Sequence, residues 1–537
     1  MHRVRYDFLS LEMMKTIVLA VLTLVFLVGS GQAPAATYYV DSVSGNDSNS
    51  GTSLGSAWQS LSKVNATTFQ AGDEILFKAG GTWTGQLWPK GSGSDGMPII
   101  IDKYGDGAPP LLNGHGLVTN VVYLYNQQYW EIKNLEITNY LKGDTNLKRG
   151  VYVKAKDYGT VHHIHLVNLV IHDINGDLGD KDNGGIFFEI KGSSRQTKFD
   201  DFLIDGCHIY DVDRTGISNH SSWDTRTFTT NTDWYPSTNV VIRNNVIERA
   251  GNNGLIVRVC DGALIEHNVF KRCSLKGSGN AMFPFNCDNT IVQYNEAYLT
   301  VYNPGDNDAS GFDSDYRCKN SIFQYNYSHD NGRGFMVVCC KGGSTRFNDG
   351  TIVRYNISQN DGGNVFRISG QTTNTLIYNN TIYLGPATSS RVIWHRSWNG
   401  AWPARTRYYN NILYNLGSGN YSFGSSTGNV FSYNVFYGNH PSNEPDDSYK
   451  ITSDPRLIGP GSGGISINTV DGYKLRSDSP CIDSGMTIAE NGGLDYWRKP
   501  VPYNSTATDR GAYESQEKGS GDFDLDDDVD PPEACLQ

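Results

Sequence analysis

The chain has 537 residues, of which 59 are glycine and 32 are tyrosine, and charged residues make up only 19%. Few charges and many aromatic side chains exclude a disordered chain, and the net charge of −12 gives no support for nucleic-acid binding. Frequent glycine disfavours a helical bundle, because glycine destabilises helices, and suits short strands joined by turns.

The first 36 residues have the pattern of a secretory signal peptide. Lys15 precedes an apolar run over residues 16–28, and a segment of small residues ends at Ala35 and Ala36. The apolar run of about 13 residues is shorter than the roughly 20 that span a bilayer. We therefore expect cleavage near residue 36 and a secreted chain, extracellular or periplasmic, that has no membrane contact after cleavage.

An internal repeat dominates the rest of the chain. Segments rich in β-branched residues, such as Val241–Ile247 and Leu264–Phe270, alternate with period two, which is typical of strands. They carry asparagines that recur about every 23 to 31 residues, at Asn245, Asn268, Asn295, Asn326, Asn356, Asn380, Asn411 and Asn434. This spacing predicts a parallel β-solenoid in which the asparagines stack as an amide ladder at one turn.

A second strand is predicted in each coil, introduced by glycine or asparagine. If the residue after the glycine points inward, alternation turns the third and fifth residues of each strand outward. The predicted outward residues are Phe187, Glu189, Ser218, His220, Ile256, Arg258, Phe283, Phe285, Asp313, Asp315, Met336, Phe366, Ile393 and His395. Arg367 breaks this alternation, which predicts a bulge or a one-residue shift there.

The stacked coils resemble the right-handed parallel β-helix of the pectate-lyase-like family of secreted polysaccharide-active proteins. Tyr38-Tyr39-Val40-Asp41 near the start and Asp509-Arg510-Gly511-Ala512-Tyr513-Glu514 near the end are similar to the terminal regions of secreted members. The resemblance covers roughly residues 37–516 and implies an all-β fold with N- and C-terminal capping segments. Because the fold carries lyases, glycoside hydrolases, epimerases, esterases and adhesins, it does not by itself specify the chemistry.

The sequence predicts that the chain is organised in five segments. We expect a signal peptide at 1–36, an N-terminal cap and first coils at 37–120, and coils with a catalytic groove at 121–440. C-terminal coils and a cap at 441–516 and an acidic tail at 517–537 complete the chain, which we expect to be a monomer. The aspartates of the tail resemble a Ca²⁺ loop of the dockerin or EF-hand type, but Asp527 stands where such loops need glycine, which favours a plain acidic tail.

Long polar loops indicate where a site lies. They precede the second strands at 175–184, 274–280 and 299–310 and follow them at 221–237, 341–349 and 397–406, so these strands form the floor of a groove that can hold an extended polymer. Trp223 and Trp398 lie in the loops and Trp394 on the floor. Since aromatic faces stack on sugar rings, the pattern predicts a polysaccharide substrate; ordinary loop packing is the alternative for each tryptophan.

Asp313 and Asp315 are the sharpest catalytic candidates. Residues two apart on a strand share a face, about 6.5 Å apart at Cα, and two carboxyl groups at that spacing suit glycoside hydrolysis. Repulsion raises the pKa of one of them and makes that group the acid. A solvated acidic edge without function is the alternative.

Other polar residues on neighbouring coils complete the predicted groove. Glu189 and His220 are further catalytic candidates. Arg258 and Arg367, about 10 Å below and above the aspartates, are predicted to bind a carboxylate or sulfate of the substrate. His395 and Arg396 are predicted to bind substrate as well.

Two other functions stay open at this stage. In a Ca²⁺-dependent polysaccharide lyase, Asp313 and Asp315 would hold the metal, the single cofactor for which the sequence offers ligands. The lack of lysine on the floor disfavours lyases that use lysine as the base. A non-catalytic glycan-binding or adhesion protein is the third possibility. Cys260, Cys287, Cys318 and Cys340 follow the second strand at matching points, so either disulfides between coils or a stack of thiols is predicted.

Overall fold

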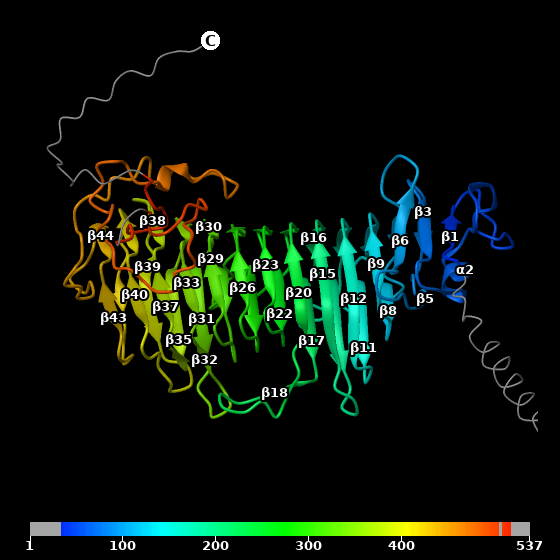
Figure 1. Cartoon of the computed structure of the whole chain (residues 1–537), viewed down its shortest axis with the longest axis horizontal. Coiled ribbons are helices and arrows are strands. Elements are labelled where there is room, and N and C mark those ends of the chain that lie inside the picture. Colours follow the sequence, from blue (N-terminus) through cyan, green and yellow to red (C-terminus); the bar gives the residue numbers. More distant parts are fainter. Residues whose placement is uncertain (1–33, 504–506, 517–537) are drawn as a thin grey trace, which may run out of the picture.

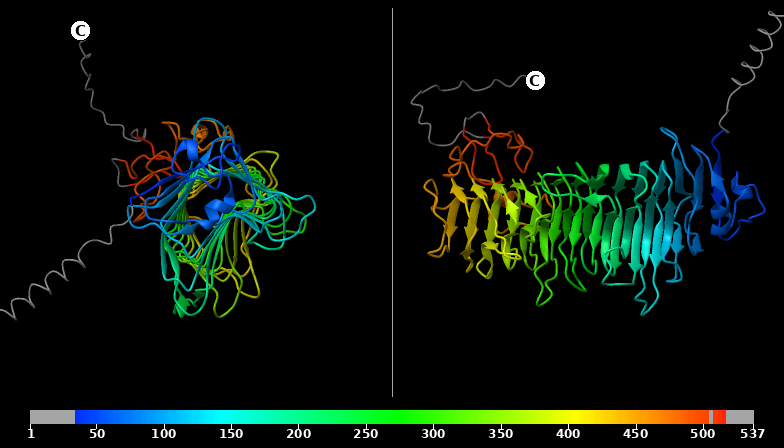
Figure 2. Two further views of the ribbon diagram at one scale, coloured as in Figure 1. Left: turned by 90° about the vertical axis from the view of Figure 1, so that its right-hand side faces the viewer. Right: turned by 90° about the horizontal axis from the view of Figure 1, so that it is seen from below.

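The computed structural model describes residues 34–503 and 507–516, so the greater part of the predicted signal peptide and the whole acidic tail lie outside the described residues. Strands lie side by side along the long axis of the molecule (Figure 1). Seen along that axis, they form walls around a common interior (Figure 2, left). All strand pairs within the three large sheets are parallel.

In the described part of the chain, the first sheet has 14 strands. They are β1 (Thr37–Val40), β3 (Glu74–Lys78), β6 (Ile99–Tyr104), β9 (Trp130–Lys133), β12 (Thr160–Val167), β15 (Lys198–Asp205), β20 (Thr238–Arg243), β23 (Leu264–Glu266), β26 (Ile291–Gln293), β29 (Ile322–Gln324), β33 (Ile352–Arg354), β37 (Leu376–Tyr378), β40 (Arg407–Tyr409) and β43 (Val430–Ser432).

The second sheet has 13 strands among the same residues. They are β4 (Thr82–Thr84), β7 (Leu111–Asn113), β10 (Glu136–Asn139), β13 (Val170–Ile174), β16 (His208–Val212), β21 (Val246–Glu248), β24 (Val269–Lys271), β27 (Glu296–Tyr298), β30 (Tyr327–His329), β34 (Ile357–Gln359), β38 (Thr381–Leu384), β41 (Ile412–Asn415) and β44 (Val435–Gly438).

The third sheet, again counted over residues 34–503 and 507–516, has 11 strands. They are β8 (Asn120–Tyr125), β11 (Arg149–Lys156), β14 (Gly184–Lys191), β17 (Thr215–Ser221), β22 (Leu255–Arg258), β25 (Met282–Phe285), β28 (Ser310–Ser314), β31 (Gly334–Cys340), β35 (Asn364–Gly370), β39 (Arg391–Arg396) and β42 (Tyr421–Ser422). Three small pairs join loops: β2 (Thr68–Phe69) with β5 (Lys90–Gly91), β18 (Asp224–Thr225) with β19 (Asp233–Trp234), and β32 (Asn348–Asp349) with β36 (Thr372–Thr373).

The chain visits the three sheets in turn, which confirms the right-handed parallel β-helix. Each full coil has three strands, whereas the sequence predicted two. The predicted strand Val241–Ile247 is in fact β20 and β21, separated by Asn244 and Asn245. Asn244 has a φ of 55°, and this left-handed residue bends the chain in the middle of an otherwise regular alternation.

The predicted asparagine ladder is confirmed at the turn between the first and second sheets. At Asn326, for example, Oδ1 accepts hydrogen bonds from the backbone N–H and the Nδ2 of Asn295, both at 3.0 Å. The ladder ends where Nδ2 of Asn434 donates to Oδ2 of Asp447 (3.0 Å). The left-handed residue at this turn is the one before each asparagine, as at Tyr325 with a φ of 58°, so the asparagine itself serves as the hydrogen-bonding group.

The register of the third sheet differs from the prediction in its later coils. Phe312 pairs with Met336, Met336 with Phe366 and Phe366 with Ile393, and all four side chains lie in the core. Met336, Phe366 and Ile393 therefore point inward, and the prediction that they face out is wrong. The cause is Gly334, which pairs with Ser310 and not with Gly311, so counting from the glycine misplaced each later strand by one residue.

With this correction Arg367 needs no bulge. Asp313 pairs with Val337, Val337 with Arg367, and Arg367 with Trp394, so Arg367 occupies the same outward row as Asp313, two coils further along. The opposite holds for His395. It pairs with Ile368 in an inward row, and its ring is 1% exposed, held by Tyr408 Oη and Ser426 Oγ at 2.9 Å each.

The two ends of the coil stack are covered differently. Helix α2 (Leu61–Ala66) buries Leu61 and Val64 against the first coils, and Ser60 caps its N-terminus by accepting from Lys63 N. The segment after β44 forms no further strand among the described residues: a single parallel bridge pairs Ile451 with Val435, and a short 3-10 helix lies at Asp471–Tyr473 (Figure 1). The segment turns back along the edge between the first and second sheets, which corrects the prediction of C-terminal coils at 441–516.

Hydrogen bonds fix this returning segment to coils far from the C-terminus. Asn410 Nδ2 donates to Met486 O (2.8 Å), and Tyr325 Oη donates to Leu494 O (3.2 Å). Because the segment covers the edge with the asparagine ladder, it leaves the outer face of the third sheet open. Among the described residues, the structure has no helix that is long and apolar enough to cross a membrane.

The eight cysteines of the described residues are unpaired and buried. At the predicted inter-coil positions, the backbone N–H of Cys260 donates to Sγ of Cys287 at 3.4 Å. Of the two alternatives that the sequence left open, the structure shows the stack of buried thiols.

Candidate active site

A cavity of about 360 Å³ opens on the outer face of the third sheet. Its floor comes from β25, β28, β31, β35 and β39, and its walls come from loops that precede and follow these strands. The acidic lining residues are Asp308, Asp313 and Asp315; the basic ones are Lys181, Arg214, Arg367 and Arg396; the aromatic ones are Phe283, Tyr316 and Trp398; Asn253, Ser278, Asn280, Asn307, Cys339 and Ser369 complete the lining. The cavity thus lies in the groove that the polar loops predicted.

The strand β28 and the residue after it place two carboxyl groups on the cavity floor. Asp313 and Asp315 both face outward, while Ser314 between them points inward and hydrogen-bonds Thr351 Oγ1 at 2.9 Å. The predicted alternation is therefore confirmed for this pair. Asp313 is nearly fully buried, at 4% exposure, whereas Asp315 is partly accessible.

Two neighbouring side chains hold Asp313 from opposite sides. Nδ2 of Asn280 donates to its Oδ2 at 2.9 Å, and the amide is oriented because its Oδ1 accepts from Ala309 N and Ser310 N. Sγ of Cys339 lies 3.7 Å from Oδ1 of Asp313 and 3.3 Å from Oδ1 of Asp315. One thiol therefore bridges the two carboxyl groups, which makes them close neighbours.

The surroundings favour the protonated form of both groups. Burial raises the pKa of Asp315 to about 6. Burial and the charge of Asp315 hold the pKa of Asp313 well above its ordinary range. Burial and both carboxyl groups also raise the pKa of the Cys339 thiol well above its usual value, so this thiol stays protonated and acts as a hydrogen-bond donor.

Asp308 supplies a third carboxyl group from the loop before β28. Its Oδ1 accepts from Nη2 of Arg367 at 3.3 Å, and its Oδ2 accepts from Ser278 Oγ at 3.0 Å. Asp308 therefore forms an ion pair with Arg367 at the cavity. Asp308 and Asp315 thus differ in environment, since one carboxyl group is paired with a cation and the other is desolvated.

Cationic side chains lie on both sides of the aspartates. Arg214 and Lys181 come from loops before β17 and β14, and Arg367 and Arg396 come from β35 and β39. Burial and the charge of Arg258 lower the pKa of Arg214 to about 10. Burial and the charges of Arg367 and Arg333 lower the pKa of Arg396. Crowded guanidinium groups of this kind suit a substrate rich in oxygen acceptors.

Of the residues that the sequence singled out, Asp313, Asp315, Arg367, Arg396 and Trp398 line the cavity. Glu189 and His220 do not. Glu189 is buried, accepts a hydrogen bond from Tyr152 Oη and pairs with Lys191 Nζ at 2.8 Å. His220 lies 3.9 Å from it, in a separate polar cluster on β14 and β17, where burial lowers the pKa of its imidazole.

The remaining predicted residues also lie outside the cavity lining. Arg258 donates to Asn219 O (2.9 Å) and lies 4.0 Å from Asp182 Oδ1. The ring of Trp394 contacts the guanidinium groups of Arg391 and Arg396, at 4.6 and 4.7 Å from its centroid.

Two predicted substrate-binding residues are buried. Trp223 is 9% exposed and packs into the apolar core, so its predicted stacking on substrate is wrong. His395 lies inside the coil, for the register reason given above, and its predicted contact with substrate is wrong as well.

Asp308, Asn280, Lys181, Arg214 and Cys339 were missed from the sequence. The loops that carry Asp308 and Lys181 were identified as groove walls, but a polar loop does not show which of its side chains turns inward. Cys339 follows from the corrected register, because it occupies the outward row of Asp315 on the next coil.

The donor set around Asp313 and Asp315 does not fit Ca²⁺. That ion takes six to eight oxygen ligands. Here the amide Nδ2 of Asn280 and the thiol of Cys339 present hydrogen donors to the two carboxyl groups. Raised pKa values further weaken these carboxyl groups as ligands for a cation.

Fold and cavity together define a parallel β-helix protein with a cleft on its third sheet that holds three aspartates and four cationic side chains. No protein-family model matches the chain. Among curated proteins it is similar to a lacto-N-biosidase of Bifidobacterium longum subsp. longum, 28% identical over 570 residues, which covers 84% of this chain and 35% of that protein. The chain thus spans about a third of the length of this relative.

Solved structures that are similar to this chain also include a lacto-N-biosidase. The chain is similar to the GH136 lacto-N-biosidase from Eubacterium ramulus: the selenomethionine derivative is 26% identical with a TM-score of 0.57 and covers 67% of each chain. The native form is 24% identical with a TM-score of 0.58, covering 74% of this chain and 68% of that one. The complex of XylC with xylose shares the fold at 12% identity, with a TM-score of 0.51 over 90% of this chain and 99% of that chain.

Proposed function

We propose that the chain is a secreted glycoside hydrolase that cleaves an extended glycan in the cleft of the third sheet. The observation that carries this proposal is the cluster of Asp308, Asp313 and Asp315 in one cavity, with burial raising the pKa of Asp315 to about 6. The similarity to lacto-N-biosidases supports it, because such enzymes hydrolyse glycosides.

The environments of the carboxyl groups suggest their roles. Asp315 is partly accessible and burial raises its pKa to about 6, which suits a general acid that protonates the leaving glycosidic oxygen. Asp308, ion-paired with Arg367, supplies the carboxylate that attacks the anomeric carbon or activates a water. Asp313 is buried and held by Asn280 and Cys339, so it acts as a positioning residue beside Asp315.

The rest of the cavity then binds the substrate. Trp398 is exposed at the cavity and packs edge-on against Tyr316, at 5.2 Å between centroids, so a sugar ring can stack on its free face. Arg396 is held by Asn307 Oδ1 (2.9 Å) and reaches substrate oxygens, including those of a carboxylate or sulfate.

The test measures new reducing ends after incubation with a lacto-N-bioside and with neutral, uronate-containing and sulfated polysaccharides. We expect Asp315→Asn and Asp308→Asn to lower kcat at least about 100-fold, because each removes a group that acts on the reacting bond. Asp106→Asn is the control: Asp106 is exposed in the loop after β6 and does not line the cavity. Asp313→Asn should shift the alkaline limb of the pH profile, which reports deprotonation of the general acid Asp315, with a smaller loss of kcat.

Other results would redirect the assignment. Unchanged kcat in both Asp315→Asn and Asp308→Asn would refute hydrolysis at this cluster. Unsaturated, ultraviolet-absorbing product ends would establish elimination, and binding without any new ends would establish a glycan-binding protein. Secretion is tested separately by sequencing the N-terminus of the exported chain, which we expect near residue 37, and monomeric state by sedimentation.

A further inference from the structure

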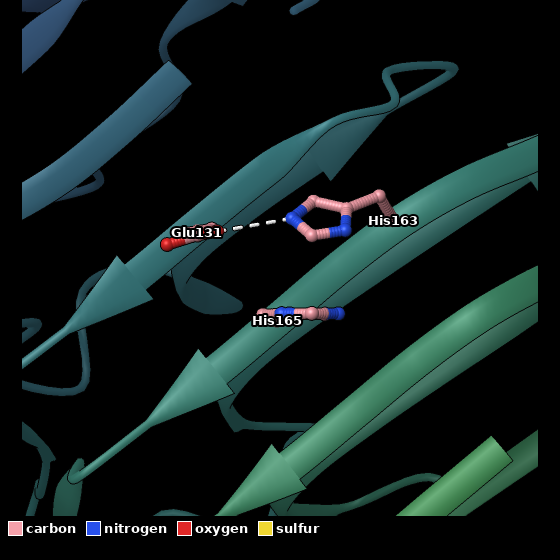
Figure 3. Close-up of side chains that lie close together, drawn as sticks. All are labelled: Glu131, His163 and His165. Carbon is pink, nitrogen blue, oxygen red and sulfur yellow. Dashed lines mark hydrogen bonds and ion pairs between the residues drawn. The ribbon is translucent and has the colours of Figure 1, made fainter. Parts of the chain in front are cut away.

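Two histidines and two carboxylates meet on the outer face of the first sheet, on coils away from the cleft. Glu131 lies on β9, His163 and His165 lie on β12, and Asp201 lies on β15. Figure 3 shows the rings of His163 and His165 next to each other, with Glu131 directed at the first of them. One ligand atom each of Glu131, His163 and His165 lies within 4.8 Å of the others.

Left-handed residues at matching points of adjacent strands bring these side chains together. His162 pairs with Asp200 and Ile164 with Phe202, so His163 and Asp201 lie opposite each other between these pairs, with φ of 52° and 64°. This bend interrupts the regular strand at His163, and the ring centroids of His163 and His165 lie only 3.8 Å apart. A regular strand would not bring these two imidazoles so close.

The hydrogen bonds of the cluster orient both rings. The carboxylate of Asp201 lies 2.8 Å from Nδ1 of His163 and 2.8 Å from Nε2 of His165. A carboxylate can only accept, so each ring donates its proton there. Nε2 of His163 and Nδ1 of His165 are then left with lone pairs, which is how a neutral imidazole presents itself to a metal.

The second ring nitrogen of His163 lies beside Glu131. Nε2 of His163 is 3.0 Å from Oε1 of Glu131, so a nitrogen and an oxygen that can both ligate a metal are neighbours. Lys133 pairs with the other oxygen of Glu131 and leaves Oε1 facing the ring. A cation bound by Nε2 and Oε1 would lie where a ligand atom of His165 also converges.

Other histidine–carboxylate contacts of the chain lack this arrangement. His172 contacts Glu136 and Asp173, and His329 contacts Glu296 and Asp330, each with a single imidazole. Within the residues that the structure describes, Glu131, His163 and His165 form the one group whose ligand atoms converge as a metal needs.

We propose that Glu131, His163 and His165 bind one Zn²⁺-like divalent cation, with Asp201 orienting the two imidazoles. Two nitrogen ligands select a late first-row metal over Ca²⁺ or Mg²⁺, which prefer oxygen. The three side chains are only partly exposed, at 16 to 22%, so an ion from solvent can reach them while the site stays shielded. The ligands come from β9 and β12, and Asp201 comes from β15. The bound metal therefore links three successive coils.

The experiment titrates Zn²⁺ into the untagged exported chain, stripped with chelator and desalted, and follows the heat of binding. We expect one high-affinity Zn²⁺ per chain, weakened at least about tenfold in His163→Ala, His165→Ala and the nearly isosteric Glu131→Gln. His172→Ala is the matched control, because it removes an imidazole held by two carboxylates on the neighbouring sheet and should leave the affinity unchanged. Excess Ca²⁺ should not compete.

A second measurement does not depend on affinity alone. At a hundredfold excess over Kd, Zn²⁺ should raise the Tm of the wild-type chain and of His172→Ala by about 2–5 °C and leave that of His163→Ala unmoved. Circular dichroism in chelator checks that each variant is folded, and Glu131→Gln stands in if a histidine variant is not. Equal Zn²⁺ affinity in the wild type and Glu131→Gln, or an equal Tm shift, would mean an adventitious ion only and would overturn the proposal. Glycan hydrolysis should not change with Zn²⁺, so a failure here is distinct from a failure of the proposed function.

Discussion

Replacing Asn326 with alanine tests the asparagine ladder at the turn between β29 and β30. The side chain makes four hydrogen bonds: Nδ2 donates to Val292 O (2.9 Å) and Asn356 Oδ1 (3.0 Å), and Oδ1 accepts from the backbone N–H and the Nδ2 of Asn295 (3.0 Å each). Asn326 has no solvent exposure, so water does not replace these partners.

The cost follows from the groups that lose their partners. Alanine leaves the backbone N–H of Asn295 without its acceptor, and an unsatisfied buried group costs about 1–3 kcal/mol. Each other lost hydrogen bond adds about 0.5–1.5 kcal/mol. We therefore expect Asn326→Ala to lower the free energy of unfolding by about 3–5 kcal/mol, which is large for one substitution.

Urea unfolding followed by tryptophan fluorescence measures this loss. A lower midpoint at constant m-value gives the change in free energy, whereas a lower m-value would show that the coils no longer unfold together. Asn468→Ala is the control, since Asn468 is exposed and should change stability by no more than about 0.5 kcal/mol. A loss in Asn326→Ala as small as that of the control would refute the idea that the ladder stabilises the stack.

Two further predictions concern the cleft and the pH dependence of stability. Trp398→Ala should raise KM about 3- to 10-fold with little change in Tm. His395→Ala should lower Tm and leave KM unchanged, because His395 is buried and hydrogen-bonded to Tyr408 and Ser426. Steady-state kinetics and thermal melts on both variants check this. Burial raises the pKa of Glu514 to about 8 and that of Asp509 to about 7, so the folded chain keeps protons that the unfolded chain releases, and stability should fall as the pH rises from about 5 to 8. Thermal melts across this range should show a shallower slope in Glu514→Gln, and an unchanged slope would contradict the assignment.

The fold was predictable because the coil repeats in sequence. Asn295, Asn326 and Asn356 recur at the spacing of a coil, and their stacking needs just the parallel arrangement that the structure has. The third strand of each coil was not predictable. A left-handed residue such as Tyr325 is unusual for its type, and the alternation of apolar residues continues across it.

The site was predictable in part for the same reason. Asp313 and Asp315 interrupt an apolar strand, and strand geometry alone puts them on one face. The predicted register of the later coils is wrong from Gly334 onward. This glycine lies one residue earlier in its strand than the glycine of the preceding coil, so the outward residues counted from it are displaced by one. The pairing of Asp308 with Arg367 joins residues 59 positions apart, and it depends on how a loop folds over the sheet.

The proposed metal site was not predicted from the sequence for a different reason. His163 and His165 look like alternating residues of an ordinary strand, and Glu131 and Asp201 lie on other coils. Their convergence depends on the left-handed residues His163 and Asp201, which no local sequence pattern predicts. Once coil stacking is known, such columns of polar residues can be identified by comparing the same position in adjacent coils.

Stacking also explains how the cleft distributes its charges. Its lining comes from successive coils of the third sheet between β14 and β39, which stack about 4.8 Å apart. Lys181 and Arg214 therefore lie on one side of the aspartates along the axis, and Arg367 and Arg396 lie on the other. Under the proposed function, a glycan that runs along the axis would have cations on both sides of the scissile bond. The backbone hydrogen bonds of the three parallel sheets set the spacing of the coils, and the asparagine ladder on the far edge adds further hydrogen bonds between the same coils. The distances between these charges therefore depend on hydrogen bonds outside the cleft.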